Sequence, residues 1–447
     1  MKFGGSSVAN ADRFRHVAEI IKARLDRRPV VVLSAMGDTT DHLLDAGDAA
    51  LKDGVVSLEK VEALHTKTIA DLGLGEDAAK QIQPLLLELR TLLTGISLIR
   101  ELTGRTKDYL VSFGERLSVR IAAAYFSSVG IKAVAVDAWE AGFLSDSNYT
   151  KAELLPESWN LIPAKLLAPA EEGVLQLVTG FLAKNDTGNI TTLGRGGSDL
   201  SATMIAAACG AEEVQVWKDV DGILTADPRL VKNAKPVEIV SYEIASELAY
   251  FGAQVLHPRA MQPCMKTGTP VLVKNSYNPE AAGTKIVSSI CCKTRPTQAI
   301  TSRRKITLVD IVSSHMLGQY GFLAEVFSWF DKHKLSVDMV ATSEVSISLT
   351  LDTASDLSEL ESDLSKIANV EIKTGKAIVT IIGDVRRSSR ILAHSFSICE
   401  KLGVQVQMIS QGASKVNISF IVEEDEADMV IKALHEDFFE TEDEGQG

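Results

Sequence analysis

The residues best suited to chemistry begin at the amino terminus, in a glycine-rich turn. Lys2 and Phe3 lead directly into Gly4, Gly5 and Ser6, and a helical pattern follows. Paired glycines let backbone N–H groups approach an anion closely, the following helix presents its positive end, and Lys2 adds a full charge. The turn therefore suits a phosphate group, although an ordinary strand-to-helix turn with a surface lysine accounts for the pattern equally well.

A second glycine-rich turn occupies residues 191–199, between a strand-like run and an apolar helix. Three of the four residues from 194 to 197 are glycine, which indicates unusual backbone angles or a close ligand. Arg195 lies among them and can hold a carboxylate with two hydrogen bonds. Ser198 and Asp199 suit the N-cap of the helix, a role that is compatible with ligand binding.

A third turn, at residues 217–229, combines acids and cations, among them Lys218, Asp219 and Arg229. The pattern is typical either of a solvated loop with an Asp-Gly turn or of the rim of a nucleotide site. The motifs GxxxxGK[ST], GxGxxG, GxSxG and HExxH are absent from the sequence. If phosphates bind, they bind in another kind of glycine loop.

These turns stand at the ends of strand-like runs. The β-branched run 29–34 predicts a strand buried on both faces, and the runs 133–136, 174–179 and 213–217 predict further strands. Residues 41–125 are mostly helical in pattern. Strands that alternate with helices indicate an α/β sheet, parallel at least in part. Turn-forming residues then place a domain boundary near residue 290.

The last third of the chain contains an internal repeat. LAEVFS at residues 323–328 matches LAHSFS at residues 392–397, and the match continues at the same offset of 69 to Leu351 and Phe420. Each copy predicts a strand, a helix of about three turns and two further strands with period-2 alternation. Two copies are too few for a solenoid, so we expect two small α+β modules packed together.

The composition is that of a globular protein. Among 447 residues, 59 Asp and Glu outnumber 46 Lys and Arg, which gives a net charge of −13 and argues against nucleic acid or an anionic membrane as partner. The five cysteines form no CxxC pair, and no apolar run approaches the roughly 20 residues of a membrane helix. We expect a soluble intracellular protein, and the abrupt start at Met1 predicts that further sequence, such as a targeting segment, precedes it.

The motifs together resemble those of a known family. KFGGSSV, TTLGRGGSD, WKDVDGILTADPR and FGAQVLHP, in this order, are similar to the motifs of aspartate kinases of the amino acid kinase superfamily, and the repeat resembles their tandem ACT domains. YLVSFGE, ELAYFGAQVLHP and VKNSYNP are most similar to the monofunctional, plant-type, lysine-sensitive branch. The resemblance implies a three-layer αβα catalytic domain at residues 1–295 and two ferredoxin-like α+β ACT modules at 303–375 and 376–440.

The activity implied by the resemblance is transfer of the γ-phosphoryl group of ATP to the side-chain carboxylate of L-aspartate, giving 4-phospho-L-aspartate. This is the first step towards lysine, threonine, methionine and isoleucine. Mg²⁺ is expected to arrive on the phosphates, with few dedicated protein ligands. The alternatives are another amino acid kinase, acting on glutamate, acetylglutamate or a nucleotide, and a non-catalytic amino-acid sensor with the same fold.

The family's functional residues carry over onto matching positions of this chain. The resemblance implies that Lys2 neutralises phosphate charge and that Asp199 orients Lys2. It also implies that Glu115 receives the substrate ammonium and that Arg195 holds a substrate carboxylate. The expected aspartate pocket comprises Thr40, Glu115, Phe181, Arg195, Gly196 and Ser198. The expected nucleotide site comprises Lys2, Gly4, Gly5, Ser6, Lys218, Asp219 and Arg229.

The two copies of the repeat differ in charge at equivalent positions. Asp338 and Glu344 of the first copy align with Gln407 and Ala413 of the second, so an effector with an additional ammonium group favours the first copy. The alternative is ordinary surface charge. The resemblance implies lysine as the effector, bound between ACT domains of two subunits. Its expected contacts are Met316, Gly321, Phe322, Leu323, Ser336, Val337, Asp338, Thr342, Ser343, Glu344 and Val345.

The resemblance also implies an assembly and a compartment. The second copy is expected to build the interface of a homodimer, while a tetramer and S-adenosylmethionine as a further effector stay open. The expected compartment is the plastid stroma for a plant or algal source and the cytoplasm otherwise.

Overall fold

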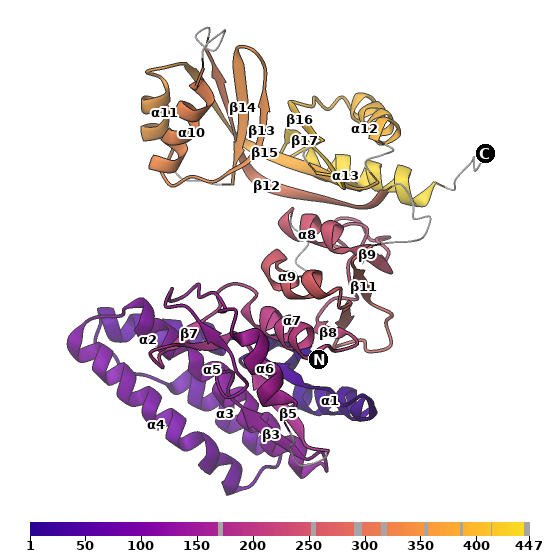
Figure 1. The fold of residues 1–447 in the computed structure, drawn as a ribbon. Coiled ribbons are helices and arrows are strands. Elements are labelled where there is room, and N and C mark those ends of the chain that lie inside the picture. The colour runs from indigo at the N-terminus through magenta and orange to yellow at the C-terminus, as the bar shows by residue number, and fades with distance from the viewer. Residues whose placement is uncertain are drawn as a thin grey trace. The chain divides into compact units, whose positions relative to one another are not determined.

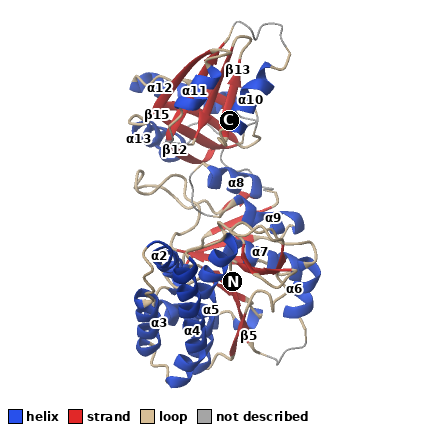
Figure 2. Ribbon diagram, turned by 90° about the vertical axis from the view of Figure 1, so that its left-hand side faces the viewer, coloured by secondary structure: helices blue, strands red, loops and turns tan. Residues whose placement is uncertain are grey.

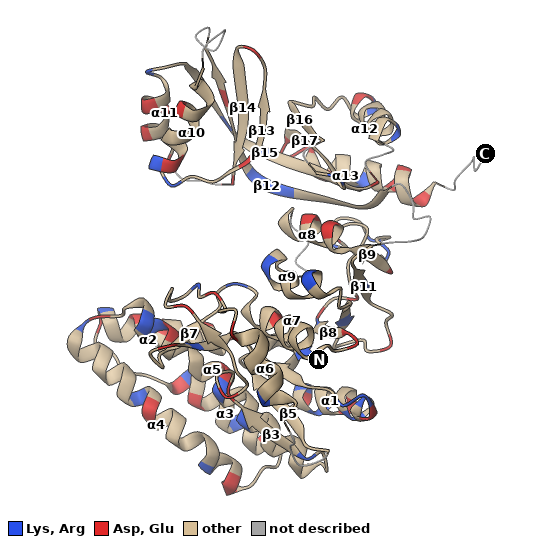
Figure 3. Ribbon diagram, in the orientation of Figure 1, with Lys and Arg blue, Asp and Glu red and all other residues tan. Residues whose placement is uncertain are grey.

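The computed structural model describes residues 1–168, 173–251, 256–289, 297–313, 320–352, 356–384, 388–412 and 414–441. The chain divides into two compact units (Figure 1). The first unit comprises Met1–Ile223, Glu238–Tyr242 and Val255–Ile290. The second unit comprises Leu224–Val237, Glu243–Gln254 and Cys291–Gly447. Lys, Arg, Asp and Glu are interspersed over the helices of both units (Figure 3).

The first unit is built on an eight-stranded sheet in the order β3-β5-β2-β1-β8-β10-β11-β9. Neighbouring strands are parallel except β10 and β11. The strands are β1 Lys2–Phe3, β2 Val31–Leu33, β3 Ala133–Val136, β5 Leu175–Thr179, β8 Val214–Lys218, β9 Ile239–Ser241, β10 Val271–Asn275 and β11 Thr284–Val287. A small sheet contains β4 Leu144–Ser145, β6 Leu182–Asn185 and β7 Ile190–Thr192. The four strands expected from apolar runs are therefore confirmed as β2, β3, β5 and β8.

Helices cover both faces of this sheet (Figure 2). They are α1 Ala11–Lys22, α2 Thr39–Lys52, α3 Glu59–Asp71, α4 Glu76–Ile99, α5 Gly104–Ser128, α6 Ser158–Leu166, α7 Gly197–Cys209 and α9 Pro258–Thr267. Neighbouring residues of a strand face opposite sides of the sheet. Phe3 and Trp217 lie in the apolar cluster formed with α1–α5, so Lys2 and Lys218, the residues next to them, face α7.

Helix α4 is long and apolar enough, by composition, to cross a membrane, and it is the one such helix among the described residues. Leu85, Leu89 and Leu93 are buried in the apolar cluster shared with α2, α3 and α5. This one-sided burial is typical of the core helix of a globular domain.

The second unit contains a six-stranded sheet in the order β13-β14-β12-β15-β17-β16. Its strands are β12 Thr297–Val312, β13 Val337–Thr342, β14 Ser346–Leu351, β15 Asn369–Gly383, β16 Met408–Gln411 and β17 Asn417–Glu423. Its helices are α10 Phe322–Lys332, α11 Ser358–Leu364, α12 Ser388–Leu402 and α13 Ala427–His435. The helix and the two strands expected in each repeat are present as α10, β13 and β14 and as α12, β16 and β17.

The two modules share their central strands. The first half of β12 pairs with the second half of β15, and the second half of β12 pairs with the first half of β15 and with β14. Residues 297–303 therefore belong to the sheet of the second module, and the expected start of the first module at residue 303 falls inside β12.

Two segments of the expected catalytic domain pack with the second unit. Ala226 and Val231 join the apolar cluster of the second module, and the backbone N–H of Ile300 donates to Thr225 O at 2.7 Å. Helix α8, Tyr242–Tyr250, leads into Phe251, which is buried against Ile306 and other sheet residues. The expected boundary at residue 295 lies outside the described residues. The chain already alternates between the two units at earlier positions, because residues 224–237 and 243–254 belong to the second unit.

Candidate functional site

Three charged side chains converge where β1, β8 and α7 meet. Lys2 Nζ lies 2.6 Å from Asp199 Oδ1, and Lys218 Nζ lies 3.6 Å from Asp199 Oδ2. Burial alone would raise the pKa of Asp199, but the two ammonium groups hold it below its usual range. Burial lowers the pKa of Lys218, and Asp199 opposes that shift. The cluster carries one net positive charge in a desolvated place, which suits an anion.

The glycine-rich turn at residues 4–7 directly follows β1 and packs against the turn after β2. A Cβ on Gly5 would stand only 3.0 Å from Ala35 O, and Gly37 N donates to Gly5 O at 3.1 Å. A Cβ on Gly4 would stand 3.4 Å from Lys2 Nζ. Larger residues at either position would therefore push the turn away from its neighbours or crowd the lysine.

Glu115 lies on α5 with its carboxyl group buried beneath the same turns. The residue is 3% exposed; Oε1 accepts from Ala35 N at 3.2 Å, and no described group hydrogen-bonds to Oε2. Burial raises the pKa of Glu115 to about 8, and Lys2 opposes part of that shift. A buried carboxylate oxygen without a partner suits a ligand cation.

The second glycine turn packs against Gly180 and Phe181 through Ser198 and Gly197. Phe181 has φ of 68°, which is a strained conformation for an aromatic residue, and its N–H donates to Ser201 Oγ at 3.0 Å. Gly196 caps α7 at φ of 72°, and a Cβ there would collide with His257 Cβ at 2.7 Å. Arg195, by contrast, is exposed. Burial lowers the pKa of His257, and the positive charge of the nearby Arg195 lowers it further.

Sequence reasoning missed one residue that supports this turn. Asp108 is buried two helical turns before Glu115 on α5, and its Oδ2 accepts from Thr150 N at 2.9 Å and from Thr192 N at 3.0 Å. Burial raises its pKa although these bonds oppose the shift. The signal was a carboxylate seven residues before another on a mainly apolar helix face.

Three further residues expected in the aspartate and nucleotide sites are Thr40, Asp219 and Arg229. Thr40 is half-buried in the first turn of α2, and Asp219 is exposed after β8. Arg229 pairs with Asp227 at 2.6 Å and belongs to the second unit. The structure therefore brings together Lys2, Asp199 and Lys218, and the nucleotide roles of Asp219 and Arg229 stay predictions.

Comparison with known proteins decides the family. The Amino acid kinase family matches residues 1–275, and the ACT domain matches residues 309–355 and 379–438. Aspartokinase 1, chloroplastic, of Arabidopsis thaliana is 48% identical over 460 residues, covering 99% of this chain and 80% of the relative. The chain belongs to the aspartokinase family. Lysine-sensitive aspartokinase 3 of Escherichia coli (strain K12) is another aspartokinase, 34% identical over 468 residues that cover 98% of each chain.

Solved aspartokinases share the fold. The crystal structure of E. coli aspartokinase III in complex with lysine and aspartate superposes with a TM-score of 0.81 at 31% identity, covering 98% of both chains. The complex of the same enzyme with aspartate and ADP gives a TM-score of 0.82, also at 31% identity, covering 98% of this chain and 99% of that one. The expected catalytic domain with tandem ACT modules is confirmed.

The residues expected to bind an aspartokinase effector lie in the first module of the second unit. The side chain of Asp338 is buried, with Oδ1 accepting from the Tyr250 hydroxyl at 2.6 Å and Oδ2 lying 3.1 Å from Arg303 Nη1. Sequence reasoning did not anticipate either partner, because both lie far from Asp338 along the chain.

The remaining effector residues surround the β13–β14 turn and the start of α10. Ser343 N donates to Ser346 O at 2.8 Å, which closes a tight turn with Glu344 exposed at its tip. Gly321 has φ of 90° and caps α10, while Phe322 is buried in the module core. Leu323, Ser336, Thr342 and Val345 are exposed, and Val337 is half-buried. Met316 lies outside the described residues.

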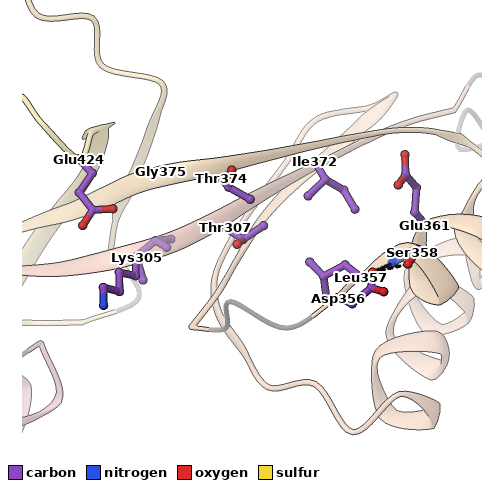
Figure 4. A pocket seen from close by; sticks show the side chains of 11 residues that line it. Lys305, Thr307, Asp356, Leu357, Ser358, Glu361, Ile372, Thr374, Gly375 and Glu424 are labelled. Carbon is purple, nitrogen blue, oxygen red and sulfur yellow. Dashed lines mark hydrogen bonds between the residues drawn. The ribbon is translucent and has the colours of Figure 1, made fainter.

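A separate cavity of about 450 Å³ lies where the two modules share β12 and β15 (Figure 4). Lys305, Thr307, Glu361, Gly375 and Glu424 are among its lining residues. The lining includes none of the residues expected to bind the effector. The cavity and the predicted effector site are therefore distinct places in the second unit.

Proposed function

We propose that the Lys2–Asp199–Lys218 cluster and Glu115 form the two halves of one active site for ATP-dependent phosphorylation of aspartate. Aspartate kinase activity follows from membership of the aspartokinase family. The observation that carries the site assignment is a positively charged, desolvated cluster beside the glycine turn, near a buried carboxyl group, Glu115, whose Oε2 has no hydrogen-bond partner among the described residues. The cationic cluster would bind the phosphates of ATP, and Glu115 would bind the ammonium group of aspartate.

The nucleotide half works by positioning and by neutralising charge. Phosphoryl transfer spreads negative charge over the oxygens of the transferred group, and fixed cations and amides stabilise it. Lys2 and the N–H groups of Gly4, Gly5 and Ser6 would contact the phosphates, while Asp199 holds Lys2 in place at 2.6 Å. Lys218 adds a second cation at the end of β8.

Mg²⁺ fits this site as a companion of the phosphates. Among the described residues, no three His, Cys, Asp or Glu side chains gather as a metal site. Phosphate oxygens and water would therefore supply most ligands, which is common for Mg²⁺ with nucleotides. When bound, the ion would supply further neutralisation of the phosphate charge.

The aspartate half selects an α-amino acid by its charges. Glu115 would receive the substrate ammonium, and the exposed Arg195 would hold a carboxylate with two hydrogen bonds. Phe181 packs against Gly197 and Ser198 packs against Gly180. With Gly196, these side chains would limit the length of the acceptor. Thr40 would contribute a hydroxyl from α2.

The experiment that tests this function is hydroxylamine trapping of the acyl phosphate made from ATP and L-aspartate. L-glutamate, which is one methylene longer, and N-acetylglutamate, which in addition lacks the free ammonium group, serve as comparison acceptors. Aspartyl hydroxamate formed with a strong preference over both acceptors is the expected result. Preference for a longer acceptor would mean another amino acid kinase, and lysine binding without any turnover would mean a sensor.

We propose lysine as the effector of the first module. A free ammonium group would compete with Arg303 and Tyr250 for the carboxylate of Asp338, and Glu344 at the tip of the β13–β14 turn offers a second acid. Lysine carries one more ammonium than the other products of this biosynthetic route. Addition of S-adenosylmethionine to a lysine titration tests whether it is a second effector.

Exposed apolar residues support a homodimer through the modules. Tyr320, Leu323, Phe327, Val340 and Val345 are exposed in the first module, and β13 is an edge strand. Exposed apolar groups on or near the end strand of a sheet are typical of an interface. Sedimentation analysis with and without lysine distinguishes a dimer from a tetramer. The expected compartment is the plastid stroma for a plant or algal source and the cytoplasm otherwise, which a fluorescent fusion of the full gene product tests.

A further inference from the structure

A short segment that starts at the last residue of β10, comprising Asn275, Ser276, Tyr277 and Asn278, crosses the end of the central sheet. We call this segment the 275–278 clasp. Asn275 is in register with Lys218, and β8 lies between β10 and β1 in the sheet. Ser276 N donates to Lys218 O at 2.7 Å, so the clasp passes over the end of β8. It therefore reaches the glycine turn from two strands away.

The clasp bonds to the glycine turn through two hydroxyl groups. Ser276 Oγ lies 2.8 Å from Ser7 Oγ, and both side chains are fully buried. The Tyr277 hydroxyl donates to Ser6 O at 3.1 Å. A turn with this many glycines has few side chains of its own to fix it, so these contacts restrict its backbone.

Arg13 on α1 holds the clasp against that turn. Its Nη2 donates to Ser276 O at 3.0 Å and to Ser276 Oγ at 2.8 Å. The centre of its guanidinium lies 3.5 Å from the centroid of the Tyr277 ring, within the range of a cation–π contact. A guanidinium that bonds to two oxygens and stacks on a ring fixes both position and orientation.

The other side of the clasp bonds to the acidic loop after β8. Asp221 Oδ1 accepts from Asn275 Nδ2 at 2.9 Å and from Asn278 Nδ2 at 3.3 Å. Asn275 Oδ1 accepts from Tyr277 N at 2.8 Å, which fixes the clasp internally. One four-residue segment thus links the glycine turn to the loop that begins at Lys218.

We propose that Arg13 and the 275–278 clasp are positioning elements for the nucleotide, which set the separation between the phosphate-binding turn and the loop at Lys218. The proposal rests on the nucleotide role proposed above for that turn. Small displacements of groups that hold reacting phosphates cause large losses of rate or affinity, because phosphoryl transfer depends chiefly on position. The side chain of Arg13 bonds to Ser276 and the side chain of Ser276 bonds to Ser7, not to the groups that are proposed to bind phosphate, so their effect on ATP is indirect.

Three variants test the proposal by removing contacts of the clasp. Ser276→Ala removes the hydroxyl that bonds to both Ser7 and Arg13. Tyr277→Phe removes the bond to Ser6 but keeps the ring against Arg13, and Arg13→Lys keeps the charge but loses the two-oxygen contact. The matched control is Ser128→Ala, which removes a hydroxyl bonded to Tyr125 O at the far end of α5. Steady-state kinetics with each substrate varied, and calorimetric titration with Mg·ADP, are the readouts.

We expect each clasp variant to raise the KM for ATP and the dissociation constant of Mg·ADP by about fivefold to thirtyfold, the loss typical of one buried hydrogen bond or of the groups it orders. The KM for aspartate should stay within about twofold, since no clasp contact reaches Glu115. Ser276→Ala and Arg13→Lys share a contact, so their combined effect should be less than additive.

Three outcomes would overturn the proposal. They are unchanged ATP and Mg·ADP parameters in all three variants, equal increases for ATP and aspartate, or an effect of Ser128→Ala of the same size. Thermal unfolding of each variant identifies loss of folding, and Tyr277→Phe is the mildest change if the others unfold. Absence of turnover in the wild type would instead refute the active-site assignment, and the Mg·ADP titration would still test the clasp.

Discussion

Raising the pH from 7 to 8.5 is expected to strengthen aspartate binding through Glu115. Burial raises the pKa of this carboxyl group to about 8, and the group must be ionised to pair with the substrate ammonium. From that pKa, about one molecule in eleven is ionised at pH 7 and about three in four at pH 8.5. The KM for aspartate should therefore fall about eightfold over this interval.

The assay measures the KM for aspartate at saturating Mg·ATP, in steps from pH 6.5 to 8.5. The KM for ATP, measured over the same steps, is the internal control. Calorimetry in buffers of different ionisation enthalpy should show close to one proton released on aspartate binding at pH 7. In Glu115→Gln the KM should be higher by about tenfold to a hundredfold and independent of pH, because a bond to a charged group is lost.

The reasoning has two clear points of failure. If the wild-type KM for aspartate is flat across this interval, Glu115 is not the group that ionises on binding. If Glu115→Gln keeps the wild-type slope, another group carries the pH dependence and Glu115 has no role in recognising the ammonium.

Three further expectations concern single side chains. Lys2→Ala should lower kcat by about a thousandfold while lysine binding in calorimetry is retained, and appreciable turnover would contradict a catalytic Lys2. The control is Lys52→Ala, which removes an exposed lysine paired with Asp48 and should leave kcat unchanged. Glu344→Ala should raise the lysine concentration for half-inhibition at least about tenfold without changing the uninhibited rate. Glu359→Ala on α11 is the control and should leave that concentration unchanged. If the inhibition curves of Glu344→Ala and the wild type superimpose, the proposed lysine site is refuted. Glu115→Gln should also change stability: between pH 4.5 and 8 the folded wild type holds a proton that the unfolded chain has lost, so its stability falls as pH rises. The variant lacks this slope, and in denaturant titrations its advantage should grow by up to about 1.4 kcal/mol per pH unit; a constant difference would contradict the raised pKa.

Local pattern predicted the strands well, because a short apolar run bounded by turn residues is typical of a buried parallel strand. The run 29–34 was expected as a strand buried on both faces, and it contains β2, all three residues of which are buried. The approach of Lys2 to Asp199 was expected from the resemblance, and the geometry of β1 and α7 confirms that the two meet. Alternation along β1 explains why Phe3 is in the core while Lys2 faces α7.

Contacts between distant parts of the chain were not predictable in the same way. Arg13 bonds to a residue 263 positions away, and Tyr250 bonds to Asp338 across 88 positions. Neither pairing leaves a periodic or local signal, because each depends on how the elements pack. VKNSYNP was noted for its similarity to one branch of the family, yet nothing in its letters indicates that it bonds to the glycine turn.

The interleaving of the two units limits how this protein can be divided into fragments. Ala226 and Val231 are covered by the second module, and Phe251 is buried against its sheet. A catalytic fragment ending near residue 295 would carry these side chains with nothing to cover them, and a regulatory fragment starting at residue 297 would present the matching bare sites. Exposed apolar pairs of this kind favour aggregation over independent folding. Gene fusions or exchanges of regulatory domains between relatives would therefore have to transfer residues 224–237 and 243–251 together with the tandem modules.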